Sequence, residues 1–298
     1  MAMINRLVYS KFMAFASRSS AGNHEGPFRR VRVRSLLVLV GLGLIITPVF
    51  WLPIAAVVED EDLTRQLLGI AFFTFPLWWI LRQRKRANLS LMSLVGESPA
   101  PGTVVRSLTV VLPLGLASIG SVYLVYYPLS FLAPGFVQIW LLDPIYFVTP
   151  PPGTDYPVLY AALGGLAGIV IAPILEELIF RGLVLQRWAH KWGPRAGILG
   201  SSALFAVGHP DVLGAFLVGC VLSALYLRTR SLLVPIACHV ANNCLSALAE
   251  LVFSKYDMPG PFDVAGVAEF QSEWWQGFTC LIVAAPWVVY FLRRNWPA

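Results

Sequence analysis

The stretch VLYAALGGLAGIVIAPILEELIFRGLVLQRWAHK, residues 158–191, decides how this chain folds. It is a long apolar run that carries two adjacent carboxylates, Glu176 and Glu177, and an arginine, Arg181. An apolar run of this length is typical of a membrane-spanning helix. Ionisable groups are costly in lipid, and those that occur there usually face the bundle interior and mark a functional site. The stretch therefore predicts a transmembrane helix that turns functional side chains inward.

The composition of the whole chain also indicates a membrane protein. Of its 298 residues, 57% are hydrophobic and only 13% are charged, whereas a soluble domain has about 25% charged residues. The mean hydropathy is +0.69. We expect an all-α fold, a polytopic membrane helix bundle of about eight transmembrane helices. The four cysteines show no metal-binding spacing and are predicted to be small buried hydrophobes.

The expected domain organisation is simple. A basic tail, residues 1–35, precedes a transmembrane bundle, residues 36–298. The proline-rich segment 133–157 is expected to be irregular, with its apolar part, 136–148, lying at the membrane interface. A polar loop is expected at 252–276. The eight predicted spans are 36–58, 67–81, 108–132, 158–191, 195–208, 212–227, 232–251 and 277–292.

The distribution of positive charge predicts the orientation of this bundle. Of the 22 lysines and arginines, 19 fall in the N-terminal tail, the C-terminus and alternate loops. The positive-inside rule then places both termini in the cytoplasm. The same pattern explains the net charge of +6 without a nucleic-acid partner. We therefore expect an integral, multi-pass protein of a bacterial cell membrane, in contact with the lipid bilayer.

Polar side chains recur in three motifs along the second half of the chain. These motifs are Glu176-Glu177-xxx-Arg181, Phe205-xxx-His209 and His239-xxx-Asn243. Residues four apart on a helix lie on one face, which predicts a Glu177–Arg181 ion pair. His239 and Asn243 have the same spacing, which places them one turn apart on one helix face. Glu176 points about 100° away from Glu177, so the two carboxylates need not share one role.

A hairpin at Gly193-Pro194 would bring the first two motifs together. Glu176 and His209 each lie about 22–26 Å along their helices from this turn, so they are predicted to reach a similar depth. Desolvation raises the pKa of carboxyl groups in general, which suits a general base. A neighbouring histidine can orient water, while a second histidine and an amide can donate hydrogen bonds to an oxyanion. This set of groups fits the attack of water on a carbonyl.

The three motifs, in this order on successive apolar segments, resemble the CAAX protease and bacteriocin-processing (CPBP, or Abi) family of intramembrane proteases. This family includes the type II CAAX prenyl endopeptidases. The resemblance covers about residues 157–250 and implies a bundle of about eight helices with the site in an internal cavity. It implies that Glu176 activates water with His209 as its partner. It further implies that His239 and Asn243 stabilise the oxyanion, and that Glu177 and Arg181 support the site.

The sequence leaves alternatives open for both the cofactor and the function. Glu176, His209 and His239 could instead bind Zn²⁺ with open positions for water, and the family has been described with both metal-dependent and metal-free mechanisms. The leading hypothesis is an endopeptidase that cleaves a membrane-associated or prenylated, CAAX-like peptide or protein. A non-catalytic membrane scaffold is one alternative. A proton-coupled transporter is another, since buried Glu and His also form proton relays, although no internal repeat supports it.

Single residues have simpler interpretations beside these. Glu177 and Arg181 are interpreted chiefly as a structural ion pair, and Phe205 as a packing residue. Asp211 is predicted to cap the N-terminus of the following helix, and Asn242 ranks behind Asn243 as the amide of the site. The sequence leaves the physiological substrate and the oligomeric state open.

Overall fold

The computed structural model describes residues 27–55, 61–100, 102–142, 148–151, 153–255 and 266–297. Within these ranges the chain is almost entirely helical and forms no named strand. An isolated antiparallel bridge joins Gly96 to Ser231. The predicted all-α membrane helix bundle is therefore confirmed.

The described helices include short 3₁₀ segments (η1, η2) and three π-helical segments (η3, η4, η5). In chain order they are η1 (Pro27–Arg30), α2 (Arg34–Ala55), α3 (Glu61–Phe72), α4 (Thr74–Ala87), α5 (Leu91–Val95), α6 (Thr103–Ser107), η2 (Leu108–Val110), α7 (Val111–Leu132), α8 (Pro134–Val137), η3 (Gln138–Leu142), α9 (Pro157–Gly165), η4 (Leu166–Ile171), α10 (Ala172–Glu177), η5 (Leu178–Leu185), α11 (Gln186–Trp192), α12 (Pro194–Ala206), α13 (Val212–Thr229), α14 (Leu233–Lys255), α15 (Val267–Ser272) and α16 (Trp274–Asn295).

Four of the described helices are long and apolar enough to cross a membrane. They are Thr103–Leu132, Pro157–Trp192, Val212–Thr229 and Trp274–Asn295. The helix that carries Glu176 is thus a continuous rod of 36 residues, built from α9, η4, α10, η5 and α11. By contrast, α12 has 13 residues and extends about 20 Å, less than the ~30 Å of a hydrocarbon core. The predicted span at 195–208 is therefore a helix too short to cross a membrane by itself.

The predicted break between the fourth and fifth helices is confirmed. α11 ends at Trp192 and α12 begins at Pro194, where a proline fits because the first helical N–H has no partner in the helix. Gly193 between them has φ +89°, in the left-handed region that favours glycine. A Cβ at Gly197 would lie 2.8 Å from the backbone nitrogen of Ala189, so this glycine lets the two helices pack closely as a hairpin.

Three boundaries differ from the sequence prediction. The second span is two helices, α3 and α4, that are separated at Phe73. The segment predicted to be irregular forms helix over residues 134–142, because Pro134 occupies the start of α8, where proline is tolerated. The rest of the predicted interface segment lies partly outside the described residues, and so does most of the basic tail. The loop predicted at 252–276 contains α15.

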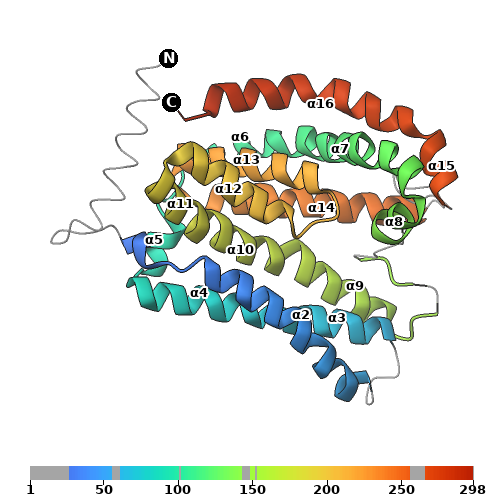
Figure 1. Ribbon diagram of the computed structural model, residues 1–298, viewed down its shortest axis with the longest axis horizontal. Helices are drawn as coiled ribbons and strands as arrows, with labels where there is room; N and C mark the ends of the chain where they lie inside the picture. The colour runs from blue at the N-terminus through green and yellow to red at the C-terminus, as the bar shows by residue number, and fades with distance from the viewer. Residues whose placement is uncertain are drawn as a thin grey trace.

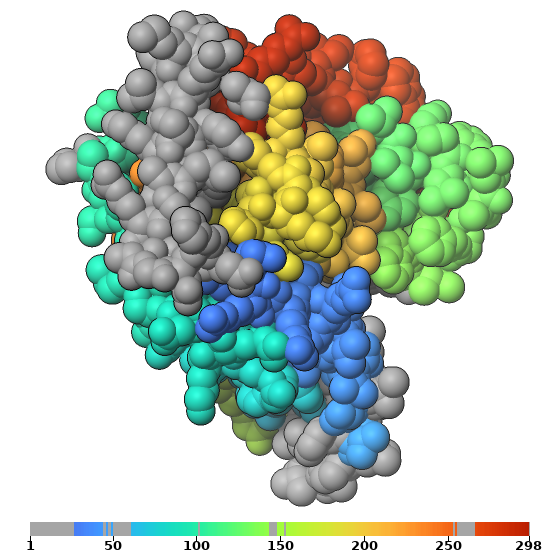
Figure 2. Space-filling model, turned by 60° about the vertical axis from the view of Figure 1, so that its left-hand side comes forward, coloured from blue at the N-terminus to red at the C-terminus, as the bar shows by residue number. Residues whose placement is uncertain are grey.

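The helices lie side by side in layers (Figure 1). α16 and α7 form one side, α2 and α4 form the other, and the helices from α9 to α14 run between them. Figure 2 shows the same order, with α12 in yellow between red α16 and the blue N-terminal helices. The motif-bearing helices therefore occupy the middle of the bundle.

The positively charged helix ends lie at the same end of the bundle. α4, α11, α13 and α16 all finish on the left in Figure 1. We call this the basic end, after the basic residues in the last turns of these helices: Arg84, Lys85, Arg86, Lys191, Arg228, Arg293 and Arg294. Clustering at one end is what the charge pattern predicts. The side of the membrane that it faces stays a prediction.

Two large apolar clusters meet beside the motifs. One includes Trp79 and Leu183, and the other includes Phe205 and Val221. Phe180 packs against both clusters. The central rod is therefore fixed by packing on both sides where its charged residues lie.

Candidate active site

The two adjacent carboxylates lie in different surroundings on one short α-helical segment. α10 ends at Glu177 and is flanked by the π-helical segments η4 and η5. Such π-helical segments interrupt the regular bonding of a helix and are frequent at functional sites. The side chain of Glu177 is fully buried, whereas that of Glu176 is 29% exposed. Their different directions, expected from helix geometry, separate a buried carboxylate from an accessible one.

Glu177 is buried as part of an ion pair. Arg181 Nη1 donates to Glu177 Oε1 at 2.6 Å, and the Arg181 side chain is only 1% exposed. Arg181 Nη2 also donates to the carbonyl oxygen of Gly219 at 3.4 Å, and its guanidinium lies 4.7 Å from the centre of the Phe205 ring. The predicted i,i+4 ion pair is formed. Together these contacts offset much of the desolvation cost of burying the two charged side chains.

His239 connects the two carboxylates. Its Nδ1 lies 2.9 Å from Glu177 Oε1. A carboxylate that pairs with arginine can only accept a hydrogen bond, so Nδ1 carries a proton. On the other edge of the ring, Nε2 lies 3.6 Å from Glu176 Oε2. This distance is longer than a hydrogen bond, and it places the imidazole edge beside the accessible carboxylate.

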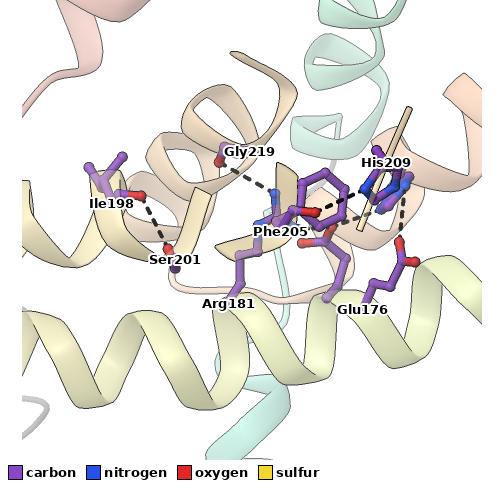
Figure 3. Close-up of polar contacts among 9 residues, drawn as sticks. Glu176, Arg181, Ile198, Ser201, Phe205, His209 and Gly219 are labelled. Carbon is purple, nitrogen blue, oxygen red and sulfur yellow. Dashed lines mark hydrogen bonds and ion pairs between the residues drawn. The ribbon is translucent and has the colours of Figure 1, made fainter. Parts of the chain in front are cut away.

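His209 is oriented by its own helix end. Its Nδ1 lies 2.9 Å from the carbonyl oxygen of Phe205. A carbonyl only accepts, so Nδ1 is the donor, and Nε2 is the nitrogen that can bind water or substrate. No hydrogen bond or ion pair joins Glu176 to His209 among the described contacts; the histidine that faces Glu176 is His239. Figure 3 shows Glu176 and Arg181 extending from one helix toward Phe205 and His209.

Phe205 is the residue around which the motifs gather. Its side chain is 2% exposed, and its ring centre lies 4.4 Å from that of His209 and 5.8 Å from that of His239. Arg181 lies on the same ring. The interpretation of Phe205 as a packing residue is therefore incomplete, because its ring separates and spaces three polar groups while its carbonyl orients one of them.

Asn243 contacts the central rod one turn beyond His239. Its Nδ2 donates to the carbonyl oxygen of Gly168 at 2.9 Å. Gly168 lies in η4, where π-helical bonding changes the partners of the backbone carbonyls. An amide carries two N–H donors, so one donor of Asn243 is used by Gly168 and the second is available to another acceptor.

The loop that carries His209 is anchored to α7. Asp211 Oδ1 accepts from the backbone N–H of Gly214 at 2.9 Å and from Ser121 Oγ at 2.7 Å. Tyr126 donates its hydroxyl to the carbonyl oxygen of Pro210 at 2.6 Å. The predicted N-cap of α13 is confirmed, and the side chains on α7 add a tertiary anchor that the sequence did not predict.

Replacing Asp211 by alanine is expected to lower the free energy of unfolding by about 1–2 kcal/mol, since the variant loses an N-cap. Replacement by asparagine keeps the accepting Oδ1 and is expected to cost much less. Thermal unfolding of the purified variants in detergent would measure both effects. An equal loss in the two variants would show that the loop needs the charge of Asp211 rather than its acceptor oxygen.

The residues as placed do not form a three-ligand metal site. In the part of the chain that the structure describes, no group of three or more His, Cys, Asp or Glu side chains is arranged to hold a metal ion. Of the three ligands considered from the sequence, His239 engages Glu177 and Glu176, while His209 turns Nδ1 to Phe205. The mechanism assigned to these residues therefore uses no metal ion.

The fold and the site define a helical membrane protein with inward-facing Glu, Arg, His and Asn side chains. Residues 158–245 match the family model described as type II CAAX prenyl endopeptidase Rce1-like. All six predicted site residues, from Glu176 to Asn243, fall inside this range. The resemblance predicted from the three motifs is thus confirmed, and this part of the chain is similar to the Rce1-like type II CAAX prenyl endopeptidases.

One curated protein is also similar in part. An uncharacterized 24.3 kDa protein of Escherichia coli is 32% identical over 87 residues, which make up 26% of this chain and 40% of that protein. The similarity therefore spans less than half the length of this relative. No solved structure matches the chain.

Several groups at the site were not predicted from the sequence. The carbonyl oxygens of Gly168 and Gly219 accept hydrogen bonds from Asn243 and Arg181. A backbone carbonyl gives no pattern in the sequence, so neither contact could be found there. Ser121 and Tyr126 lie about 90 positions before the loop that they hold, and only tertiary packing brings them to it.

Proposed function

We propose that this chain is an intramembrane endopeptidase that hydrolyses a peptide bond in a membrane-associated or prenylated, CAAX-like peptide or protein. The observation that carries the proposal is the pair of adjacent carboxylates in different roles. Glu177 is buried and contacts both Arg181 and His239, whereas Glu176 is partly exposed beside the same histidine. The match of residues 158–245 to the Rce1-like family model supports peptide hydrolysis as the reaction.

In this mechanism Glu176 is the general base. A water held between Glu176 and Nε2 of His209 loses a proton to the Glu176 carboxylate as its oxygen attacks the substrate carbonyl carbon. The carbonyl becomes a tetrahedral oxyanion. The proton then passes to the leaving nitrogen, the C–N bond breaks, and the products are a carboxylate and an amine.

The oxyanion is stabilised by donors on α14. Nε2 of His239, on the edge of the ring away from the Glu177 contact, donates to the oxyanion when the ring carries a proton on both nitrogens. Asn243 offers the amide hydrogen that Gly168 does not use. Donors fixed in advance at the position of the developing charge account for much of the rate in such reactions. Glu177 and Arg181 fix the orientation of the His239 imidazole, so we assign them a positioning role.

Hydrolysis by the purified protein tests this proposal. We expect the wild-type protein in detergent to cleave members of a quenched peptide library, and Glu176→Gln to lose this turnover while it stays folded. Glu97→Gln is the matched control, because Glu97 is an exposed carboxylate 3.8 Å from Arg230, outside the site. Mass spectrometry of the products would map the cleaved bond.

Two results would contradict the proposal. Turnover retained by Glu176→Gln would remove the assigned base. Full biological activity of a Glu176→Gln protein without any detectable hydrolysis would instead favour a membrane scaffold.

A further inference from the structure

A row of buried polar groups leads away from the Glu177–Arg181 ion pair. On α13, Gly219, Ser223 and Tyr226 follow one another at intervals of four and three residues, so they lie on one helix face. From Gly219 to Tyr226 this face extends about 10 Å along the helix. Its far end lies one turn before Arg230, which caps α13 at the basic end. The row thus connects the middle of the bundle with its basic end.

Contacts from two other helices join this face. Arg181 Nη2 donates to the Gly219 carbonyl oxygen. A Cβ at Gly219 would lie 2.9 Å from Ser202 Oγ, which places α12 directly against the same position. At the far end, Gln186 Nε2 donates to the Tyr226 hydroxyl. The path from Arg181 to Gln186 follows η5, where π-helical i→i+5 bonding brings residues five apart above one another.

Four polar atoms in this row have no hydrogen-bond partner in the protein: Glu177 Oε2, Arg181 Nε, Ser202 Oγ and Ser223 Oγ. Each belongs to a residue that is no more than 1% exposed. Leaving a buried polar group unpaired is unfavourable, so several unpaired atoms along one row call for a bound partner. The nearby Cys220 thiol, which approaches Ser202, is only a weak one.

Simple packing between helices does not explain this arrangement. If the serines served only to join helices, their hydroxyls would bond across the interface. Ser201 shows the alternative on the same helix, because its hydroxyl donates to the carbonyl oxygen of Ile198 at 3.2 Å. Ser202 and Ser223 do not satisfy themselves in this way. Buried waters typically make two to four hydrogen bonds to such groups.

We propose that this polar row, made by η5, α12 and α13, binds a file of water molecules between the Glu177–Arg181 pair and the basic end of the bundle. Water is the ligand because the unpaired atoms include both donors and acceptors and carry no excess of one charge. The binding of water does not depend on the proposed function of the protein. Only the use of this water in hydrolysis rests on the proposed function.

Radiolytic hydroxyl-radical labelling of the whole protein in detergent tests the water file. Radicals formed from bound water modify side chains next to it, even where bulk solvent does not reach. Tyr226 and Tyr123 are each only 3% exposed, and Tyr123 stacks on Phe270 in an apolar cluster away from the row. We expect Tyr226 to be labelled several-fold more than Tyr123. Equal labelling of the two tyrosines would overturn the proposal.

A valine at position 223 is expected to interrupt the file. Ser223→Val should lower the labelling of Tyr226 to the level of Tyr123, whereas the matched control Ser201→Val should leave it unchanged. Ser223→Ala serves the same purpose if the valine variant does not fold. Unchanged labelling of Tyr226 in a folded Ser223 variant would contradict the assignment.

A kinetic measurement separates this inference from the proposed function. If the file supplies the reaction, Ser223→Val lowers kcat several-fold with KM unchanged. If the protein has no peptidase activity, the labelling pattern still reports the water. Normal kcat in a Ser223→Val protein that has lost its labelling would show that the file does not feed the reaction.

Discussion

Replacing His209 by asparagine is expected to lower kcat about 10²- to 10⁴-fold, the usual contribution of a positioned acid–base group, without unfolding the protein. The physical reason is that the two nitrogens of the imidazole have different partners. Nδ1 donates to the Phe205 carbonyl oxygen at 2.9 Å, and the amide of asparagine can reproduce this bond. The variant lacks any group in the place of Nε2, which we assign to the water.

Two further variants make this result interpretable. His209→Gln places an amide nearer to the position of Nε2 and is expected to retain more activity than His209→Asn. His190→Asn is the matched control, since His190 lies near the end of α11, far along the rod from the carboxylates, and should keep full turnover. Peptide cleavage and thermal unfolding would be measured together. If His209→Asn kept normal kcat, the assigned role of Nε2 would be wrong.

Replacing Arg181 by methionine is expected to lower the free energy of unfolding by about 3–5 kcal/mol, because it leaves a buried carboxylate without its counter-ion. The Glu177 side chain is fully buried, and one of its oxygens, Oε2, already lacks a protein partner. The loss also removes the guanidinium from the Phe205 ring. Denaturation in detergent, followed by tryptophan fluorescence, would measure the change.

The double variant Glu177→Gln with Arg181→Met separates charge from packing. Removing both charges is expected to recover much of the stability, and the amide oxygen introduced at position 177 would still accept from His239. Arg65→Met is the control at the surface. Arg65 is 62% exposed and pairs with Glu61 and Asp62, and exposed pairs contribute only about 0–1 kcal/mol. A similar loss for Arg65→Met and Arg181→Met would contradict a special role for the buried pair.

Activity is expected to depend on Arg181 more indirectly than on Glu176. Arg181 holds Glu177, and Glu177 holds His239 through Nδ1. The double variant should therefore fold while it turns over peptide more slowly than the wild type, because an amide oxygen positions the imidazole less strongly than a carboxylate does.

Features that depend on neighbouring residues were predictable from the sequence. The i,i+4 spacing predicted the Glu177–Arg181 pair, the Gly193-Pro194 dipeptide predicted the hairpin, and Asp211 before an apolar run predicted a helix cap. The first follows from helix geometry, in which one residue advances 1.5 Å and 100°, and the others from the backbone chemistry of glycine, proline and N-cap residues. The central rod and the all-α membrane class could be expected from the apolar runs, and the clustering of positive helix ends from the positive-inside rule.

The partners of the side chains across helices were decided by tertiary structure alone. Similar depth made a Glu176–His209 pair reasonable, yet the histidine that faces Glu176 is His239. Depth along a helix follows from counting residues, but the face that meets a neighbour depends on how each helix rotates and packs. The π-helical segments on both sides of α10 alter that rotation.

The order and spacing of residues were thus enough to predict which polar residues lie within the helix bundle and which of them share a helix face. Tertiary structure decided that Phe205 stands between Arg181, His209 and His239, and that a backbone carbonyl of the rod receives Asn243. The physical reason is that local geometry is set by bonds within one helix. Contacts between helices are set by the packing of many side chains at once, which no short motif encodes.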